Sequence, residues 1–158
     1  MAIELSSKIK ILERIHKMKE ERLASAKEED YLEVIYELSK EKGYVKPKDI
    51  SRILNVKAGT VTKMLQTLSE KKFINYEKYG GITLTETGKK IAEEIDKKHS
   101  IIRDFLTLLK VDSNRANLEA EGIEHVISED TLLRIKKLND FIKGNKEIEN
   151  KLREFIEV

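Results

Sequence analysis

The sequence has no cysteine, a single proline and no long apolar segment. Without cysteine the chain can form no disulfide and carry no thiolate nucleophile, and any metal ion that it binds must be held by nitrogen and oxygen. No stretch approaches the roughly 20 apolar residues that a membrane span needs. We therefore expect a cytoplasmic protein with no membrane partner.

The chain also lacks an excess of either charge. Its 158 residues include 31 Lys and Arg against 29 Asp and Glu, which leaves a net charge of +2. This balance excludes a polybasic tail protein and an acidic substrate mimic, so any affinity for nucleic acid depends on where the charges lie. A chain of this length can bury one sizeable core or two small ones.

Apolar residues recur mostly three and four positions apart, which predicts a mainly α protein. The helical pattern is interrupted once, where two short alternating segments flank a pair of glycines and predict a β-hairpin. We expect helices over residues 7 to about 24, 27–42 and 85 to about 109, a short helix from Pro47, another after Asn55 and three more after Asp112, with strands at 73–77 and 82–84.

The helix after Asn55 has two different faces. Its apolar residues follow the spacing i, i+3, i+4 and i+7 and therefore pack inward together. Its other face carries small or hydrogen-bonding side chains and one cation, which can approach base edges and phosphates. With the basic hairpin, this pattern predicts a winged helix-turn-helix that binds DNA; the alternative is a small helical domain whose hairpin contacts another protein. The candidate DNA-binding residues are Lys57, Thr60, Thr62, Lys63, Gln66, Lys78 and Tyr79.

Two segments place acidic side chains at helical ligand spacing. In a helix, residues three and four apart lie above one another, so Asp30 and Glu33 present their carboxylates from one face. The second segment does the same with Glu121, Glu124 and His125. Other acidic pairs of the chain share this spacing and are expected to be solvated, so either segment alone is more typical of a charged surface.

The histidines strengthen the case for a metal site. His99 falls inside the apolar stripe of the long helix that starts near residue 85, where a histidine alone is more often a hydrogen-bonded core residue than a ligand. The chain has only three histidines, however, and His125 extends a carboxylate pair. The set that can hold a divalent metal ion is Asp30, Glu33, His99, Glu121, Glu124 and His125.

Several motifs make the chain resemble a known family from about residue 28 to residue 142. They are EDYLEVIY at 29–36, VTKM at 61–64, YEKY at 76–79, LT at 84–85, GKKI at 88–91, VD at 111–112 and EGIEH at 121–125. These motifs are similar to those of the diphtheria toxin repressor family, in its short branch of manganese transport regulators. Longer members add an SH3-like domain, which we do not expect here because no strand-rich segment follows the helices.

The resemblance implies a function and a ligand set. The same six side chains would hold the regulatory metal, with the possibility of two ions per subunit. Iron-responsive relatives carry methionine and cysteine where this chain has Asp30 and Glu121, and hard oxygen donors suit Mn²⁺ better. We therefore expect a manganese-responsive repressor of metal uptake genes, with Fe²⁺ as the second choice, that binds double-stranded operator DNA.

The chain is expected to divide into three parts. Residues 1–26 form an N-terminal extension that is helical, residues 27–92 form the winged helix-turn-helix domain, and residues 93–158 form a helical domain for metal binding and dimerisation. The long helix at about 85–109 links the last two. Apolar stripes outside the winged unit exceed what one small bundle needs, so we expect a homodimer.

Three alternatives remain open. The chain could be an iron-responsive regulator of the same family, or a winged-helix regulator that needs no metal. A di-iron oxidase would use similar donors, but such enzymes place Glu and His at i and i+3 on two helices. Here His125 follows Glu124 directly, so we expect no enzyme and no small-molecule substrate.

Overall fold

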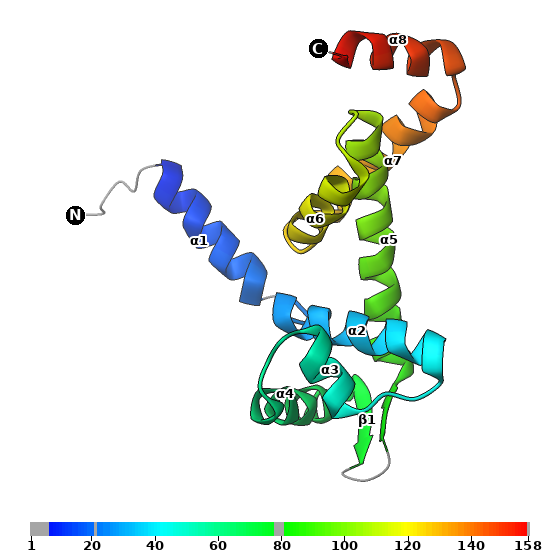
Figure 1. Ribbon diagram of the computed structural model, residues 1–158. Coiled ribbons are helices and arrows are strands. Elements are labelled where there is room, and N and C mark those ends of the chain that lie inside the picture. Colours follow the sequence, from blue (N-terminus) through cyan, green and yellow to red (C-terminus); the bar gives the residue numbers. More distant parts are fainter. Residues whose placement is uncertain (1–6, 21, 78–80, 158) are drawn as a thin grey trace, which may run out of the picture.

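The computed structural model describes residues 7–20, 22–77 and 81–157 (Figure 1). Lys78 and Tyr79, two of the residues expected to contact DNA, lie outside these ranges. The described elements are α1 (Ser7–Glu20), α2 (Ala26–Lys42), α3 (Pro47–Ile53), α4 (Ala58–Glu70), β1 (Ile74–Glu77), β2 (Gly81–Leu84), α5 (Glu86–Leu108), α6 (Ser113–Glu124), α7 (Glu129–Lys143) and α8 (Lys146–Ile156). The expected fold class, mainly α with a winged helix-turn-helix and a helical C-terminal half, is confirmed.

The helices form two groups joined by α5. Helices α2, α3 and α4 gather with the β-hairpin at one end, and α5 runs from this group to the other end of the molecule (Figure 1). Helices α6 and α7 pack against α5, and α8 follows α7. Helix α1 extends away from the start of α2 (Figure 1). No helix in the described ranges is both long enough and apolar enough to cross a membrane.

Helix α2, which carries the first two candidate ligands, has well-defined ends. The Ser25 side chain accepts a hydrogen bond from the Glu28 backbone N–H, and the Glu28 carboxylate accepts one from the Ser25 backbone N–H at 2.8 Å. This capping box starts the helix. Gly43 ends it in the left-handed conformation, with a φ of 73°, where glycine carries no steric penalty.

Close packing fixes the junction between the hairpin and α5. The Thr85 hydroxyl donates a hydrogen bond to the Lys72 carbonyl at 2.7 Å, and its side-chain oxygen accepts one from the Gly88 backbone N–H. A Cβ atom at Gly88 would lie 2.0 Å from the Phe73 carbonyl oxygen, so only glycine fits there. Helix α5 therefore leaves the hairpin in a fixed direction.

Most buried apolar side chains belong to the winged-helix half. Its core joins side chains of α2, α3 and α4 with those of the hairpin and the first half of α5. Leu32, Ile35 and Leu65 are fully buried in it. A second and much smaller cluster lies in the other half, where Ile102 packs with Ala120 and Leu132.

Two expectations about local structure are wrong. The opening helix ends at Glu20 rather than near residue 24, because Ser25 caps α2 and Ala24 is buried before it. In the sequence, Ile50, Ile53 and Leu54 have the spacing i, i+3 and i+4, which predicts that all three are buried on one face of α3, yet the Ile53 side chain is 53% exposed. Helix α3 ends at this residue, and the Ile53 side chain lines an open groove between α2, α3 and α6 instead of the core.

Candidate metal centre

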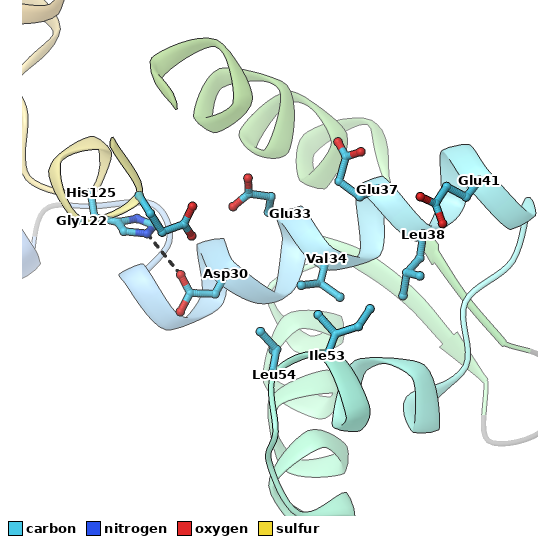
Figure 2. Close-up of a pocket in the computed structure, with 11 residues that line it drawn as sticks. Asp30, Glu33, Val34, Glu37, Leu38, Glu41, Ile53, Leu54, Gly122 and His125 are labelled. Carbon is cyan, nitrogen blue, oxygen red and sulfur yellow. Dashed lines mark ion pairs between the residues drawn. The ribbon is translucent and has the colours of Figure 1, made fainter. Parts of the chain in front are cut away.

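Three helices bring the predicted ligands together. Asp30 and Glu33 lie on α2, His99 lies on α5, and Glu121 and Glu124 lie on α6 with His125 at its C-terminal cap. Side chains from both halves of the chain line one groove of about 710 Å³, including Asp30, Glu33, Glu121 and His125. Figure 2 shows Asp30 and His125 facing each other across it, with Glu33 one turn further along α2.

Within the described residues, the donors form two groups in which all ligand atoms lie within 4.8 Å of one another. The first group contains Asp30, Glu121 and His125, and the second contains His99, Glu121 and Glu124. Glu121 belongs to both groups. The sequence left the division of the donors open, and this geometry divides them around a shared carboxylate.

The distances show which atoms face each other. In the second group, His99 Nδ1 lies 2.7 Å from Glu124 Oε2 and 3.6 Å from Glu121 Oε2. In the first group, His125 Nε2 lies 3.2 Å from Asp30 Oδ1. Glu33 is not a member of either group, but it lines the same groove and is close enough to Glu121 for that carboxylate to raise its pKa.

At the C-terminal end of α6, neighbouring side chains point in different directions. Consecutive residues in a helix point about 100° apart, so Glu124 turns toward α5 while His125 turns toward α2. The expectation that Glu121, Glu124 and His125 converge from one face is therefore wrong in detail. Only Glu121 reaches both groups.

Burial and crowding shift the proton equilibria of the carboxylates. Burial, and then the negative charge of Glu121, raise the pKa of Glu33 to about 7. The same two causes raise the pKa of Glu124 to about 7. Glu33 and Glu124 therefore bind protons near neutral pH, and a metal ion has to displace these protons in order to bind.

The two imidazoles carry positive charge more readily than free histidine does. Hydrogen bonds to Asp30 and Glu29 raise the pKa of His125 to about 10. Burial lowers the pKa of His99, but hydrogen bonds to Asn117 and Glu124 outweigh burial and leave that pKa above its ordinary value. Each imidazole therefore has to give up a proton before it can bind a metal ion.

One orphaned atom supports a metal in this place. Glu124 is only 3% exposed, and its Oε1 has no hydrogen-bond partner among the described residues, while its Oε2 pairs with His99. A buried carboxylate oxygen without a partner is costly unless a cation binds it. The donor set of carboxylates and imidazoles fits a divalent ion such as Mn²⁺ or Fe²⁺.

The sequence reasoning missed two residues beside the imidazoles. Glu29 Oε2 lies 2.7 Å from His125 Nδ1, and Asn117 Oδ1 lies 3.2 Å from His99 Nε2. Asn117 stands four residues before Glu121 on α6, so helical spacing could have found it. No spacing pattern links Glu29 to a histidine 96 residues away.

The residues predicted to contact DNA lie on α4 and just before it, and none of the predicted metal ligands belongs to this helix. Val61, Leu65 and Leu68 are buried, so the opposite face of α4 points to solvent. The candidate residues on this face and just before it are all exposed: Lys57, Thr60, Thr62, Lys63 and Gln66. The Thr62 hydroxyl donates a hydrogen bond to the Ala58 carbonyl at 3.0 Å, which leaves its oxygen free to accept one.

Comparison with known proteins agrees with this arrangement. The HTH-type transcriptional regulator MntR of Shouchella clausii (strain KSM-K16) is 40% identical over 126 residues, which cover 80% of this chain and 88% of that protein. The structure of the manganese regulator SloR superposes with a TM-score of 0.64 at 31% identity and covers 72% of this chain. A manganese-dependent transcriptional repressor in complex with manganese gives a TM-score of 0.66 at 27% identity, also over 72% of this chain. The chain spans 54% and 53% of these two solved chains.

Two family models together match most of the chain, from residue 24 to residue 156. Residues 24–82 match the N-terminal DNA binding domain of the iron dependent repressor, and residues 85–156 match its metal binding and dimerisation domain. Both descriptions are those of transcriptional regulators, which confirms the expectation that the chain is not an enzyme. The chain belongs to the iron-dependent repressor family.

Proposed function

We propose that the protein is a manganese-responsive transcriptional repressor that binds operator DNA as a homodimer. The observation that carries this proposal is the first donor group, in which Asp30 of the winged-helix half meets Glu121 and His125 of the other half. In this proposal residues 27–92 read DNA, and residues 93–158 bind metal and pair the subunits. A regulator of chromosomal genes works beside the DNA, so we place it in the cytoplasm.

The ligands connect the two halves. Glu33 and Glu124 lie close to Glu121, and mutual repulsion of these carboxylates loosens α2 from α6 when all of them are ionised. A bound divalent cation supplies the positive charge that offsets this repulsion. The donors on α2 and α6 then hold the winged-helix half at one fixed position relative to the dimerisation half.

A shift of α2 is transmitted to the recognition helix α4 through two contacts. The first is the shared core, where Leu32 and Ile35 of α2 belong to the same cluster as Leu65 of α4. The second is the buried Glu28, whose Oε2 accepts a hydrogen bond at 2.8 Å from the ammonium of Lys71 at the end of α4. In a two-fold dimer, fixing both α4 helices sets their separation to successive major grooves, roughly 34 Å apart.

The exposed face of α4 supports specific roles on DNA. Lys57 and Lys63 would contact phosphates, which gives affinity without sequence preference. Thr60, Thr62 and Gln66 would face base edges in the major groove, where their hydrogen-bonding groups can discriminate. For Lys78 and Tyr79, which lie outside the described residues, the sequence alone motivates a proposed contact with the DNA backbone.

The choice of manganese rests on the donors and on the relatives. Asp30 and Glu121 offer hard oxygen where softer atoms would favour later metals, and two of the similar structures are described as manganese regulators. Intrinsic affinity still rises from Mn²⁺ to Fe²⁺ and beyond, so geometry and metal availability must provide selectivity. Iron is the second candidate.

The test is a titration of DNA binding with metal. Fluorescence anisotropy of the protein with a labelled fragment of its own promoter region is measured in chelator and then with rising free Mn²⁺, Fe²⁺, Zn²⁺ or Mg²⁺. We expect Mn²⁺ to tighten binding by 100-fold or more, on the order of 3 kcal/mol. Equal binding with and without metal would refute metal dependence, and activation by Fe²⁺ where Mn²⁺ has no effect would refute the assignment of manganese.

A further inference from the structure

The two imidazoles of the metal centre turn opposite nitrogens toward the donor groups. His99 presents Nδ1 to Glu124 and Glu121, whereas His125 presents Nε2 to Asp30. A neutral imidazole has one nitrogen that binds a metal and one that carries a proton. Metal binding through these two nitrogens would therefore require different tautomers at the two histidines.

Each outward-facing nitrogen meets a partner that belongs to neither donor group. His99 Nε2 lies 3.2 Å from Asn117 Oδ1, and His125 Nδ1 lies 2.7 Å from Glu29 Oε2. Both partners can accept the proton that the metal-binding tautomer keeps on that nitrogen. Neither position is easily reached by water, because the His99 side chain is 17% exposed and the His125 side chain 13% exposed.

The neighbourhood of each partner fixes its acceptor. Asn117 donates through Nδ2 to the Ser113 carbonyl at 2.9 Å, so its amide cannot turn around without losing that bond, and Oδ1 stays on the side of His99. Glu29 lies in the first turn of α2 directly beside Asp30, and its side chain is only 17% exposed. Its carboxylate can only accept, so the imidazole must donate.

We propose that Glu29 and Asn117 are positioning residues, which hold His125 for binding through Nε2 and His99 for binding through Nδ1. This inference rests on the proposed metal dependence. The two residues differ in charge, so they act differently on the ligand that they hold. The anionic Glu29 makes the His125 imidazole a stronger donor, whereas the neutral Asn117 sets mainly the orientation of His99.

The experiment reads the coordinating nitrogen directly. Protein with ¹⁵N-labelled histidine is loaded with ¹¹³Cd²⁺, and the ¹¹³Cd–¹⁵N couplings are recorded by NMR. The wild-type protein is expected to show one coupling at an Nδ1 and one at an Nε2, assigned with His99→Gln and His125→Gln. Glu29→Ala should remove or mix the coupling of His125 alone, and Asn117→Ala should do so for His99 alone.

Metal affinity provides the second measurement. Isothermal titration of each variant with Mn²⁺ should show one binding step weakened by about 10- to 100-fold. The conservative variants Glu29→Gln and Asn117→Asp keep an acceptor and should restore the coupling pattern. Glu119→Ala is the matched control, since Glu119 lies on α6 and pairs with Arg115; it should match the wild type.

The outcomes separate this inference from the proposed function. Wild-type couplings through both histidines that persist unchanged in Glu29→Ala and Asn117→Ala, with unchanged affinity, would overturn the positioning roles and leave the metal centre intact. Coupling of both histidines through the same ring nitrogen would also overturn them. A wild-type protein that binds no cadmium or manganese at either histidine would overturn the proposed function together with this inference.

Discussion

The two halves of the molecule differ in how much of their apolar surface they bury. The winged-helix half closes a core of sixteen buried residues, whereas the described C-terminal half buries a cluster of three. That half instead exposes large apolar side chains, among them Leu118 at 75%, Phe141 at 60% and Phe155 at 85%. The first half has a core of its own, whereas the second half leaves apolar side chains exposed, which agrees with its match to a dimerisation domain.

The largest expected effect of a single substitution lies in the winged-helix core. Leu65→Ala removes a fully buried side chain and should lower the free energy of unfolding by about 2–5 kcal/mol. The matched control is Leu23→Ala just before α2, whose side chain is 65% exposed and whose loss should change the free energy of unfolding by less than about 0.5 kcal/mol. Urea titrations followed by circular dichroism measure both. Equal losses in the two variants would contradict the assignment of Leu65 to the core of the winged-helix half.

The next largest effect concerns the carboxylate that both donor groups share. Glu121→Ala should remove metal-stimulated DNA binding, a loss of about 100-fold or roughly 3 kcal/mol in the presence of Mn²⁺. Binding in chelator should stay close to that of the wild type, and the melting temperature of the metal-free protein should not fall, because the substitution removes a negative charge beside Glu33 and Glu124. Anisotropy with promoter DNA is the measurement, and Glu119→Ala on the same helix is the control. Retained stimulation in Glu121→Ala would exclude Glu121 as a ligand.

The exposed apolar side chains of α7 are expected to lie in the dimer interface. Leu138 and Phe141 stand three residues apart on this helix and are both exposed, so we expect them to be covered by the second subunit. Replacing both by serine should weaken dimerisation by at least tenfold, about 1.4 kcal/mol or more. Sedimentation velocity at a series of concentrations tests this, with Lys137→Ser as the control. An unchanged dissociation constant would place the interface elsewhere.

A smaller effect is expected from pH on the metal-free protein. The pKa of Glu124 is raised to about 7 in the folded state by burial and by Glu121, so the folded state holds the proton more tightly than the unfolded chain does. Its stabilising contribution is complete below pH 4.5 and is lost as the pH rises toward 7. The raised pKa of His125 acts in the same direction between about pH 6.5 and pH 10, through its bonds to Asp30 and Glu29.

Thermal melting in chelator should therefore show lower stability at pH 8 than at pH 5.5. Glu124 accounts for on the order of 1 kcal/mol of this loss of stability, and Glu124→Gln should remove that share while the contributions of Glu33 and His125 remain. Added Mn²⁺ should stabilise the protein more at pH 8 than at pH 5.5, because protons compete for the ligands. A metal-free protein whose stability rises over this range would contradict the assigned proton equilibria.

The smallest expected effect is that of a single phosphate contact. Lys63→Ala on the exposed face of α4 should weaken binding of promoter DNA several-fold and reduce the slope of log affinity against log salt by about 1. Lys146→Ala, at the start of the distant α8, should leave the slope unchanged. The measurement is a set of anisotropy titrations at different salt concentrations. An unchanged slope in Lys63→Ala would remove this lysine from the DNA-reading face.

Much of the fold could be predicted from periodic spacing, which depends only on neighbours in the chain. Tyr31, Ile35 and Leu38 share one stripe in the sequence and are buried together on α2. The same spacing rule found the acidic pairs, and the structure brings the predicted ligands into one region. The spacing rule fails at Ile53 because helix α3 ends at this residue, and its side chain lies in the groove instead of the core.

What could not be predicted depends on contacts between distant segments. The way in which α2, α5 and α6 pack against one another determines which donors belong to which group. In this packing Glu124 contacts His99, and His125 contacts Asp30. The pairing of Glu29 with His125 joins residues that are 96 positions apart. No local pattern contains this information, because each helix alone is compatible with several packings.

The most direct measurement is anomalous diffraction at the manganese edge from crystals grown with Mn²⁺. The account predicts strong anomalous density beside the Glu121 carboxylate, in contact with side chains of the winged-helix half and of the dimerisation half together. Absence of density there in well-ordered crystals, or density bound by one half alone, would contradict the claim that a metal ion joins the two halves.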